Sequence, residues 1–285
     1  MQHGPAVRRR KLGAELRALR TRAGLTSGEA ARRVGWHQSK VSRIETGHSG
    51  VKAADLRRLL EAYDVRNPEL LELLVVLAGS EGDGRHRWWN AYRGLLPPTY
   101  RDFISLESQA SAMRTLENSV VPGLLQTPEY AREVTRAAVD GLPDGKVEAL
   151  VEVRLARQEV LRSDTPLRLS AVLDEGVLRR SVGGPGVMAR QLRRLRDAAR
   201  LPHVRIQVLP FGVGAHVGVT GPFVIFSFST TFDLDVVVLD HLTSSLYLER
   251  EEDLQAYTEA FNSLQIHALS PEDSLDFIAG LADGE

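Results

Sequence analysis

Apolar side chains recur every three or four residues along the first 78 residues of the chain, which is the spacing of amphipathic helices. Leu12, Leu16 and Leu19 mark the first helix, and capping residues and glycines separate the helices that follow. The short spacer between the second and third helices suits the close crossing of a helix-turn-helix. The pattern predicts an all-α, five-helix domain over residues 1–78. Its helices are expected at 11–23, between Thr26 and Gly35, at 38–45, around 56–63 and at 68–78.

The third predicted helix has an apolar and a polar face. On a helical wheel, Val41 and Ile44 lie opposite the polar face, and Lys40 lies at its margin. The polar face carries an amide, two hydroxyls and a guanidinium, which belong to Gln38, Ser39, Ser42 and Arg43. These groups can hydrogen-bond to base edges in the DNA major groove, whereas a lysine at the margin suits a phosphate. The alternative is an ordinary solvated surface helix, which the helix-turn-helix spacing and the local positive charge disfavour.

Charge is distributed unevenly along the chain. Residues 1–66 have a net charge of +9 and residues 67–285 a net charge of −10, within a total of −1. A basic head on an acidic body is expected when only the head meets a polyanion, so double-stranded DNA is the predicted partner of the head. Further candidates for phosphate contacts in this head are Thr46, Arg8, Arg9 and Arg10.

The run from Leu25 to Gly47 resembles the Cro/repressor-like (XRE-type) helix-turn-helix family, and its most specific part is the string Gln-Ser-Lys-Val-Ser-Arg-Ile-Glu-Thr-Gly. The resemblance places Gln38, Ser39 and Arg43 at base-reading positions. It places Ser27, where the family often has the longer glutamine, at a phosphate-contacting position. It also implies a structural ion pair between the first and third helices, formed by Arg20 and Glu45.

A glycine-rich, polar segment at 79–87 predicts a linker, and the periodicity changes beyond it. Residues 88–285 are expected to form an α+β domain, with an antiparallel or mixed sheet and helices packed on it. Helices are predicted at 102–118, 128–140, 144–162, 187–199 and 252–267. Strands are predicted at 167–173, 204–209, 223–228, 235–239 and 245–248.

The string Val-Pro-Gly-Leu-Leu-Gln-Thr-Pro-Glu-Tyr-Ala at 121–131 carries a second resemblance. It is similar to a C-terminal domain of unknown function that is fused to Cro/repressor-like modules in many actinobacterial regulators. Some of those relatives are antitoxin-like regulators paired with a small protein. The resemblance therefore implies that residues 88–285 receive a signal or bind a small partner protein.

The sequence lacks the motifs of the common enzymes. There is no cysteine, and therefore no disulfide, thiolate catalyst or cysteine-ligated zinc. His203, His216 and His241 are isolated from acidic partners, apart from Asp240 beside His241, and adjacent strand residues point to opposite faces. The glycines at 212–218 lack the spacing of a dinucleotide loop. We therefore expect no catalytic residue, no metal and no cofactor; a DNA-tethered enzyme is the disfavoured alternative.

The remaining expectations concern assembly and location. The protein is predicted to bind DNA as a homodimer, because one such module covers too little DNA for a specific site. The signal is expected to be a small basic protein, attracted by the acidic body, with a metabolite as the alternative. Aromatic residues near the linker can either anchor that partner or build the domain core: Trp88, Trp89, Tyr92 and Tyr100. No membrane segment or signal peptide is recognisable, and a cytoplasmic protein is predicted.

Overall fold

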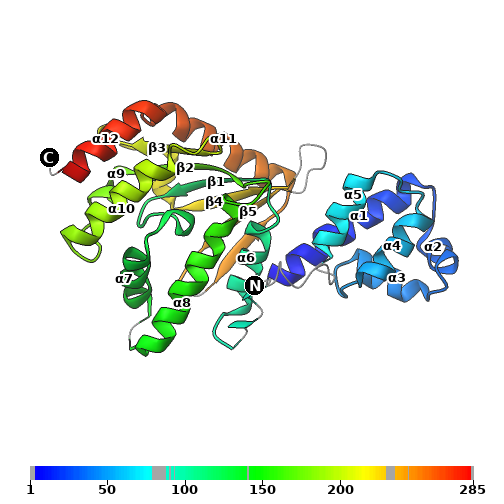
Figure 1. Ribbon diagram of the computed structural model, residues 1–285. Coiled ribbons are helices and arrows are strands. Elements are labelled where there is room, and N and C mark those ends of the chain that lie inside the picture. Colours follow the sequence, from blue (N-terminus) through cyan, green and yellow to red (C-terminus); the bar gives the residue numbers. More distant parts are fainter. Residues whose placement is uncertain are drawn as a thin grey trace. The chain divides into compact units, whose positions relative to one another are not determined.

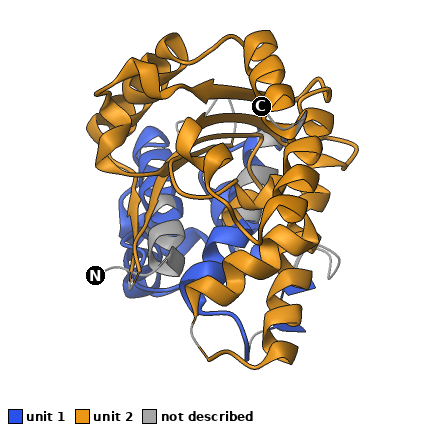
Figure 2. Cartoon of the chain, turned by 90° about the vertical axis from the view of Figure 1, so that its left-hand side faces the viewer, with its two compact units in different colours: residues 1–105 blue, residues 106–285 orange. Residues whose placement is uncertain are grey.

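The computed structural model describes residues 4–78, 88–89, 91–92, 94–139, 141–228, 235–242 and 244–283. The chain forms two compact units, residues 1–105 and residues 106–285 (Figure 2). The division at residue 105 lies further along the chain than the linker that the sequence predicts at 79–87, and that linker segment lies outside the described residues. Residues 88–105 therefore group with the helical unit.

The first unit is helical, as the periodicity predicts (Figure 1). Its first helix begins earlier than expected, at Gly4 instead of Lys11, and ends at Arg22. The predicted capping box is confirmed: the Thr26 hydroxyl accepts from the Glu29 N–H (3.2 Å), and the Glu29 carboxylate accepts from the Thr26 N–H (2.7 Å). The helices are α1 (Gly4–Arg22), α2 (Ser27–Arg33), α3 (Gln38–Glu45), α4 (Ala53–Ala62), α5 (Pro68–Leu77) and α6 (Pro98–Glu107), the last of which crosses the unit boundary.

Two glycines permit the close packing of these helices. Gly35 has φ of +70°, a left-handed conformation that turns the chain between α2 and α3. Gly13 lies against the C-terminal end of α3, where an added Cβ would be 2.5 Å from the carbonyl oxygens of Ile44 and Glu45. A side chain at residue 13 would therefore push α1 away from α3.

The second unit is built on a six-stranded mixed sheet with strand order β3-β2-β1-β4-β5-β6. β1, β2 and β3 are parallel. β4 pairs with β1, β5 with β4 and β6 with β5, and each of these pairs is antiparallel, which confirms the expected α+β class. The strands are β1 (Ala112–Glu117), β2 (Arg168–Asp174), β3 (Val204–Leu209), β4 (Phe223–Ser227), β5 (Val236–Asp240) and β6 (Ser245–Leu248). The helices and 3-10 turns of this unit are η2 (Gly123–Leu125), α7 (Pro128–Ala138), α8 (Asp144–Arg157), η3 (Gln158–Leu161), α9 (Glu175–Arg179), α10 (Pro185–Ala198), η4 (Phe211–Val213), η5 (Val217–Thr220), α11 (Glu251–His267) and α12 (Pro271–Asp283).

The prediction of one helix at 102–118 is wrong. The segment contains the second half of α6 and then β1, which lies in the middle of the sheet between β2 and β4. A short apolar run does not distinguish a buried strand from a buried helix, and the pairing on both sides decides the outcome here. The last helix, α12, was not predicted.

Helices cover the sheet on both sides. α11 packs on one face, and α7 and α8 lie on the other (Figure 1). α7 and α8 also pack against each other through Ala131, Val147 and Val151. A buried apolar cluster between α11 and the sheet consists of Leu116, Val172, Leu209, Phe223, Ile225, Val237, Leu254, Phe261 and Leu264.

The distinctive string at 121–131 comprises a mostly buried loop, which contains η2, and the first residues of α7. Glutamine side chains hold the backbone of the loop. Gln191 on α10 donates from Nε2 to the Leu125 carbonyl (2.8 Å), and its Oε1 accepts from the Thr127 backbone N–H (2.8 Å). The Gln158 side chain donates to the Gln126 carbonyl (2.8 Å), and the Gln126 side chain donates to the Val121 carbonyl (2.7 Å). Because buried backbone groups need partners, these contacts give the string a structural role.

Candidate nucleic-acid interface

α3 presents the polar face that the helical wheel predicts. Val41 and Ile44 are buried and anchor the helix. The side chains of the opposite face are exposed, and they are Gln38, Ser39, Ser42 and Arg43. The guanidinium of Arg43 makes no hydrogen bond or ion pair with any other residue that the structure describes, so its five N–H donors are available to an external acceptor.

The first residues of α2 and α3 are joined by a side-chain hydrogen bond. Gln38 Nε2 donates to Ser27 Oγ at 3.0 Å. Because Gln38 donates through its amide nitrogen, its amide oxygen takes no part in this contact. The bond fixes the direction of the side chain. The predicted base-reading residue and the predicted phosphate-contacting residue therefore lie side by side at the start of the two helices.

Lys40 is held by other residues of the unit. Its Nζ lies 2.8 Å from Asp55 Oδ2 on α4 and 3.7 Å from the ring centre of Trp36. The ammonium and the ring form a cation–π contact, which gives the large Trp36 side chain a packing role. A phosphate at Lys40 would have to share the ammonium with Asp55.

The other predicted phosphate contacts lie at the C-terminal end of α3 and in the first half of α1. Thr46 is the C-terminal cap of α3, and its hydroxyl donates to the Ser42 carbonyl (2.8 Å) and lies 2.8 Å from Nδ1 of His48. Arg8, Arg9 and Arg10 fall in the first half of α1, and their side chains lie outside the described residues.

Arg20 and Glu45, for which the family resemblance implies an ion pair, form a two-pronged contact between α1 and α3. Arg20 Nε lies 2.7 Å from Glu45 Oε1, and Nη2 lies 3.0 Å from Oε2. The hydroxyl of Tyr63 donates to the same carboxylate (3.1 Å). The hydrogen bond that Arg20 donates to Glu45 raises the pKa of the Arg20 guanidinium, and burial raises the pKa of Tyr63. This buried network fixes the position of α3.

Sequence reasoning missed Asp55 and Tyr63, which hold Lys40 and Glu45. Both lie on or beside α4, 15 and 18 residues beyond their partners. No local periodicity links residues at these separations, because the contacts depend on how α4 packs. The acidic residue in the first turn of α4 is explained locally by the helix dipole alone.

The second unit brings together some of the side chains that were considered for catalysis. His216 Nε2 lies 3.9 Å from Asp174 Oδ2, so this histidine does have an acidic neighbour, contrary to its isolation in the sequence. Its Nδ1 accepts from the Gly218 N–H (3.2 Å), and it bonds to no hydroxyl among the described residues. Asp174 is the last residue of β2, and its side chain caps α9 by accepting a hydrogen bond from the Gly176 N–H. Within the described part of the chain, no three acidic or histidine side chains form a cluster suited to a metal.

Glu117, the last residue of β1, is a carboxyl group with a strongly shifted pKa. Burial, together with the charge of Asp240, raises the pKa of Glu117 to about 8, although the Thr115 hydroxyl and Arg157 oppose the shift. A carboxyl whose folded pKa lies above its unfolded value stabilises the fold most at low pH. That contribution is lost as the pH rises from about 4.5 through about 8.

We expect Glu117→Gln to remove this pH dependence. Glutamine is neutral at every pH, so the variant and the parent protein should melt at similar temperatures at pH 5, and the variant should be more stable at pH 8–9. The difference in the free energy of unfolding between the variant and the parent should grow by at most about 1.4 kcal/mol per pH unit. Calorimetric melting from pH 4 to pH 9 measures it. The exposed Glu259→Gln serves as the control, and parallel curves for both variants would contradict the assignment.

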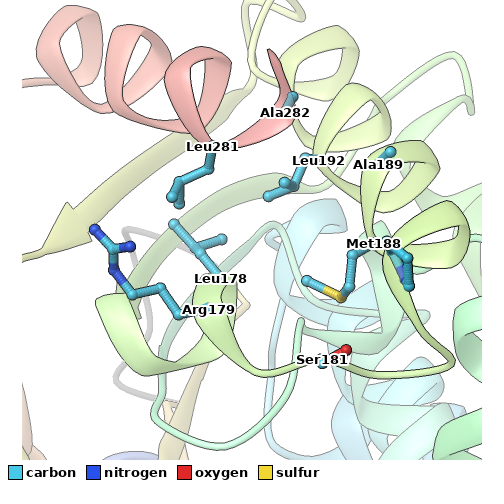
Figure 3. A pocket seen from close by; sticks show the side chains of 9 residues that line it. Leu178, Arg179, Ser181, Met188, Ala189, Leu192, Leu281 and Ala282 are labelled. Atoms are coloured by element: carbon cyan, nitrogen blue, oxygen red, sulfur yellow. The ribbon is translucent and has the colours of Figure 1, made fainter. Parts of the chain in front are cut away.

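An apolar pocket of about 370 Å³ lies between α9, α10 and α12 (Figure 3). Leu178, Leu192 and Leu281 point toward one another across it, and Arg179 lies at its rim. The charge of Arg179 is paired with Glu175, four residues earlier. The walls are therefore suited to an apolar group and offer no unpaired charge to hold a polar one.

No helix among the described residues is both long and apolar enough to cross a membrane.

Comparison with protein-family models assigns both units. A helix-turn-helix domain matches residues 11–74, which agrees with the geometry of α2 and α3 and indicates a DNA-binding regulator. A domain of unknown function (DUF5753) matches residues 100–280, which is more than half of the chain, and the chain belongs to this family. No curated protein and no solved structure matches the chain.

Proposed function

We propose that the protein is a sequence-specific transcriptional regulator that binds double-stranded DNA by placing α3 in the major groove. The observation that carries the proposal is the exposed polar face of α3, with Arg43 unpaired among the described residues. Gln38, Ser39, Ser42 and Arg43 read bases, since amide, hydroxyl and guanidinium groups match base edges. Ser27, Lys40, Thr46 and the three arginines at 8–10 contact phosphates. The cytoplasm, where the DNA lies, is the proposed place of action.

Selection of binding sites from random DNA, followed by genome-wide mapping of bound sites, tests the proposal. A single recurring sequence motif, bound more tightly than unrelated DNA at the same salt concentration, is expected. Binding of all sequences with equal affinity would contradict specific reading by α3.

The proposed binding unit is a homodimer on two half-sites. One helix-turn-helix covers a short stretch of DNA, and two-fold symmetry doubles it. Half-sites should lie about 10 bp apart, or a multiple of that turn. Light scattering of the full chain, free and bound to the selected DNA, measures the mass. A single chain per DNA site in both measurements would contradict the dimer.

The second unit is proposed to receive the signal, in the manner of an antitoxin-like regulator that binds a small basic protein. The support is electrostatic: residues 67–285, which include this unit, have a net charge of −10, and residues 106–285 alone have 17 Lys/Arg against 26 Asp/Glu. Such a charge repels DNA and attracts a basic partner. Trp89 is buried and contacts Trp88 edge to face, so these aromatics serve at least in part as core. Isolation of the tagged chain from its own cells should recover a small basic protein in equal amount that alters DNA binding. Recovery of the chain alone would contradict the partner.

A small-molecule signal is the second candidate. It is favoured by the pockets of the second unit, whose volumes of about 370 to 540 Å³ fall in the range of ligand sites.

A further inference from the structure

A pocket of about 540 Å³ lies where three segments of the second unit meet. The segments are the start of α7, the end of α8 with η3, and the middle of α10. The pocket is lined by Gln126, Thr127, Pro128, Leu155, Ala156, Gln158, Glu159, Arg162 and Arg194. It is separate from the apolar pocket of Figure 3, since the two share no lining residue.

Two arginines share the wall of this pocket. Arg162 is exposed and pairs with Glu159 (2.9 Å). Arg194 is partly buried, and its guanidinium makes no hydrogen bond or ion pair with any other residue in the described ranges. Burial and then the charge of Arg162 lower the pKa of Arg194, while Asp197 acts in the opposite direction. A second cation near a partly buried, unpaired guanidinium is unfavourable unless an anion joins them.

The remaining walls suit the same kind of ligand. α7 begins at Pro128 beside Thr127, so the positive end of its helix dipole borders the pocket. The amides of Gln126 and Gln158 are committed to backbone carbonyls, which leaves the arginines as the groups that can bind an anion. Leu155, with Pro128, supplies apolar surface next to the charges.

We propose that this pocket binds a small organic oxyanion, a phosphate or carboxylate group carried on a compact apolar body, with Arg194 as its principal charged contact. The guanidinium donates two parallel hydrogen bonds to the oxyanion, Arg162 adds charge at the rim, and the apolar wall accepts the body of the ligand. Occupation of the pocket would bridge α8, α10 and the glutamine-held loop, and so provides the second unit with a means of sensing a metabolite.

Titration calorimetry of the full chain with phenyl phosphate and with benzoate, at constant ionic strength, tests the site. The two probes distinguish a phosphate from a carboxylate ligand, and benzyl alcohol is the neutral control. We expect saturable binding of at least one anion at one site per chain. Arg194→Gln should weaken that binding about tenfold or more, the factor expected for a lost charged hydrogen bond. Arg193→Gln, on the same helix but outside the pocket lining, should bind within about twofold of the parent, as a surface change does.

The melting temperatures of the variants without ligand distinguish a ligand-binding role of Arg194 from a structural one. Because Arg194 lacks a partner, Arg194→Gln should melt at the same temperature as the parent or higher, since it relieves repulsion from Arg162. A lower melting temperature than that of Arg193→Gln would assign Arg194 a structural role and overturn the proposal. Absence of saturable binding by both anions, equal binding of benzyl alcohol, or unchanged binding by Arg194→Gln would overturn it as well. No DNA is present, so failure here is distinguishable from failure of the proposed DNA binding.

Discussion

Replacing Arg43 by alanine is expected to weaken binding to the selected operator by about 1–3 kcal/mol and to relax the preference for one base position. Arg43 is exposed on the polar face of α3, and its guanidinium has no hydrogen-bond or ion-pair partner among the described residues. A guanidinium in this position can donate two hydrogen bonds to a guanine edge. The loss should therefore be large for the operator and small for unrelated DNA.

Fluorescence anisotropy with operator and scrambled DNA, over a range of salt concentrations, measures both effects. Arg66→Ala is the matched control, because it removes the same charge from an exposed position outside α2 and α3. Lys40→Ala is expected to weaken binding to both DNAs by the same factor. It should also reduce the slope of log affinity against log salt concentration by about 1, as a lost phosphate contact does. Its effect should be partial, since Asp55 already holds the ammonium. Wild-type operator affinity for Arg43→Ala would show that α3 lies differently on the DNA.

Replacing Glu45 by alanine is expected to destabilise the first unit by about 3–5 kcal/mol. The substitution leaves the Arg20 guanidinium, which is only 12% exposed, without its carboxylate, and it removes the acceptor of the Tyr63 hydroxyl. A buried charge that loses its partner keeps the cost of desolvation. Glu45→Gln retains an acceptor for the Tyr63 hydroxyl and should therefore lose less stability than Glu45→Ala.

Urea unfolding followed by tryptophan fluorescence isolates this effect in the full chain, because all three tryptophans lie in residues 1–105. Glu15→Ala is the control: its partner Arg22 is 67% exposed, and such pairs contribute about 0–1 kcal/mol. Equal midpoints for Glu45→Ala and Glu15→Ala would show that the Arg20–Glu45 contact does not stabilise the unit.

The sequence was sufficient for features that depend on neighbouring residues. The bounds of α3, the capping box of α2 and the two faces of α3 all follow from spacing within one or two turns of helix. The five N-terminal helices and most strands of the second unit are predictable for the same reason. The Arg20–Glu45 contact spans 25 residues and was anticipated from a resemblance.

β1 shows where this reasoning fails. Its residues form a short run, half of it buried, a few residues after the end of α6, and a helix through 102–118 explains the same pattern. Pairing with β2 on one side and β4 on the other makes this run a central strand. Those partners lie about 56 and 110 residues further along the chain, as the pairs Ala112–Arg168 and Met113–Phe226 illustrate.

By itself, the sequence determined that the chain begins with a basic helix-turn-helix whose third helix has an exposed polar face, because amphipathic periodicity, caps and net charge are local properties. Only the tertiary structure decided that Lys40 is held by Asp55, that glutamines from α10 and η3 hold the loop at 121–126, and that Arg194 meets Arg162 at one pocket. Each of these contacts joins residues 15 to 66 positions apart. The packing of whole elements brings such residues together, and no local pattern in the sequence records it.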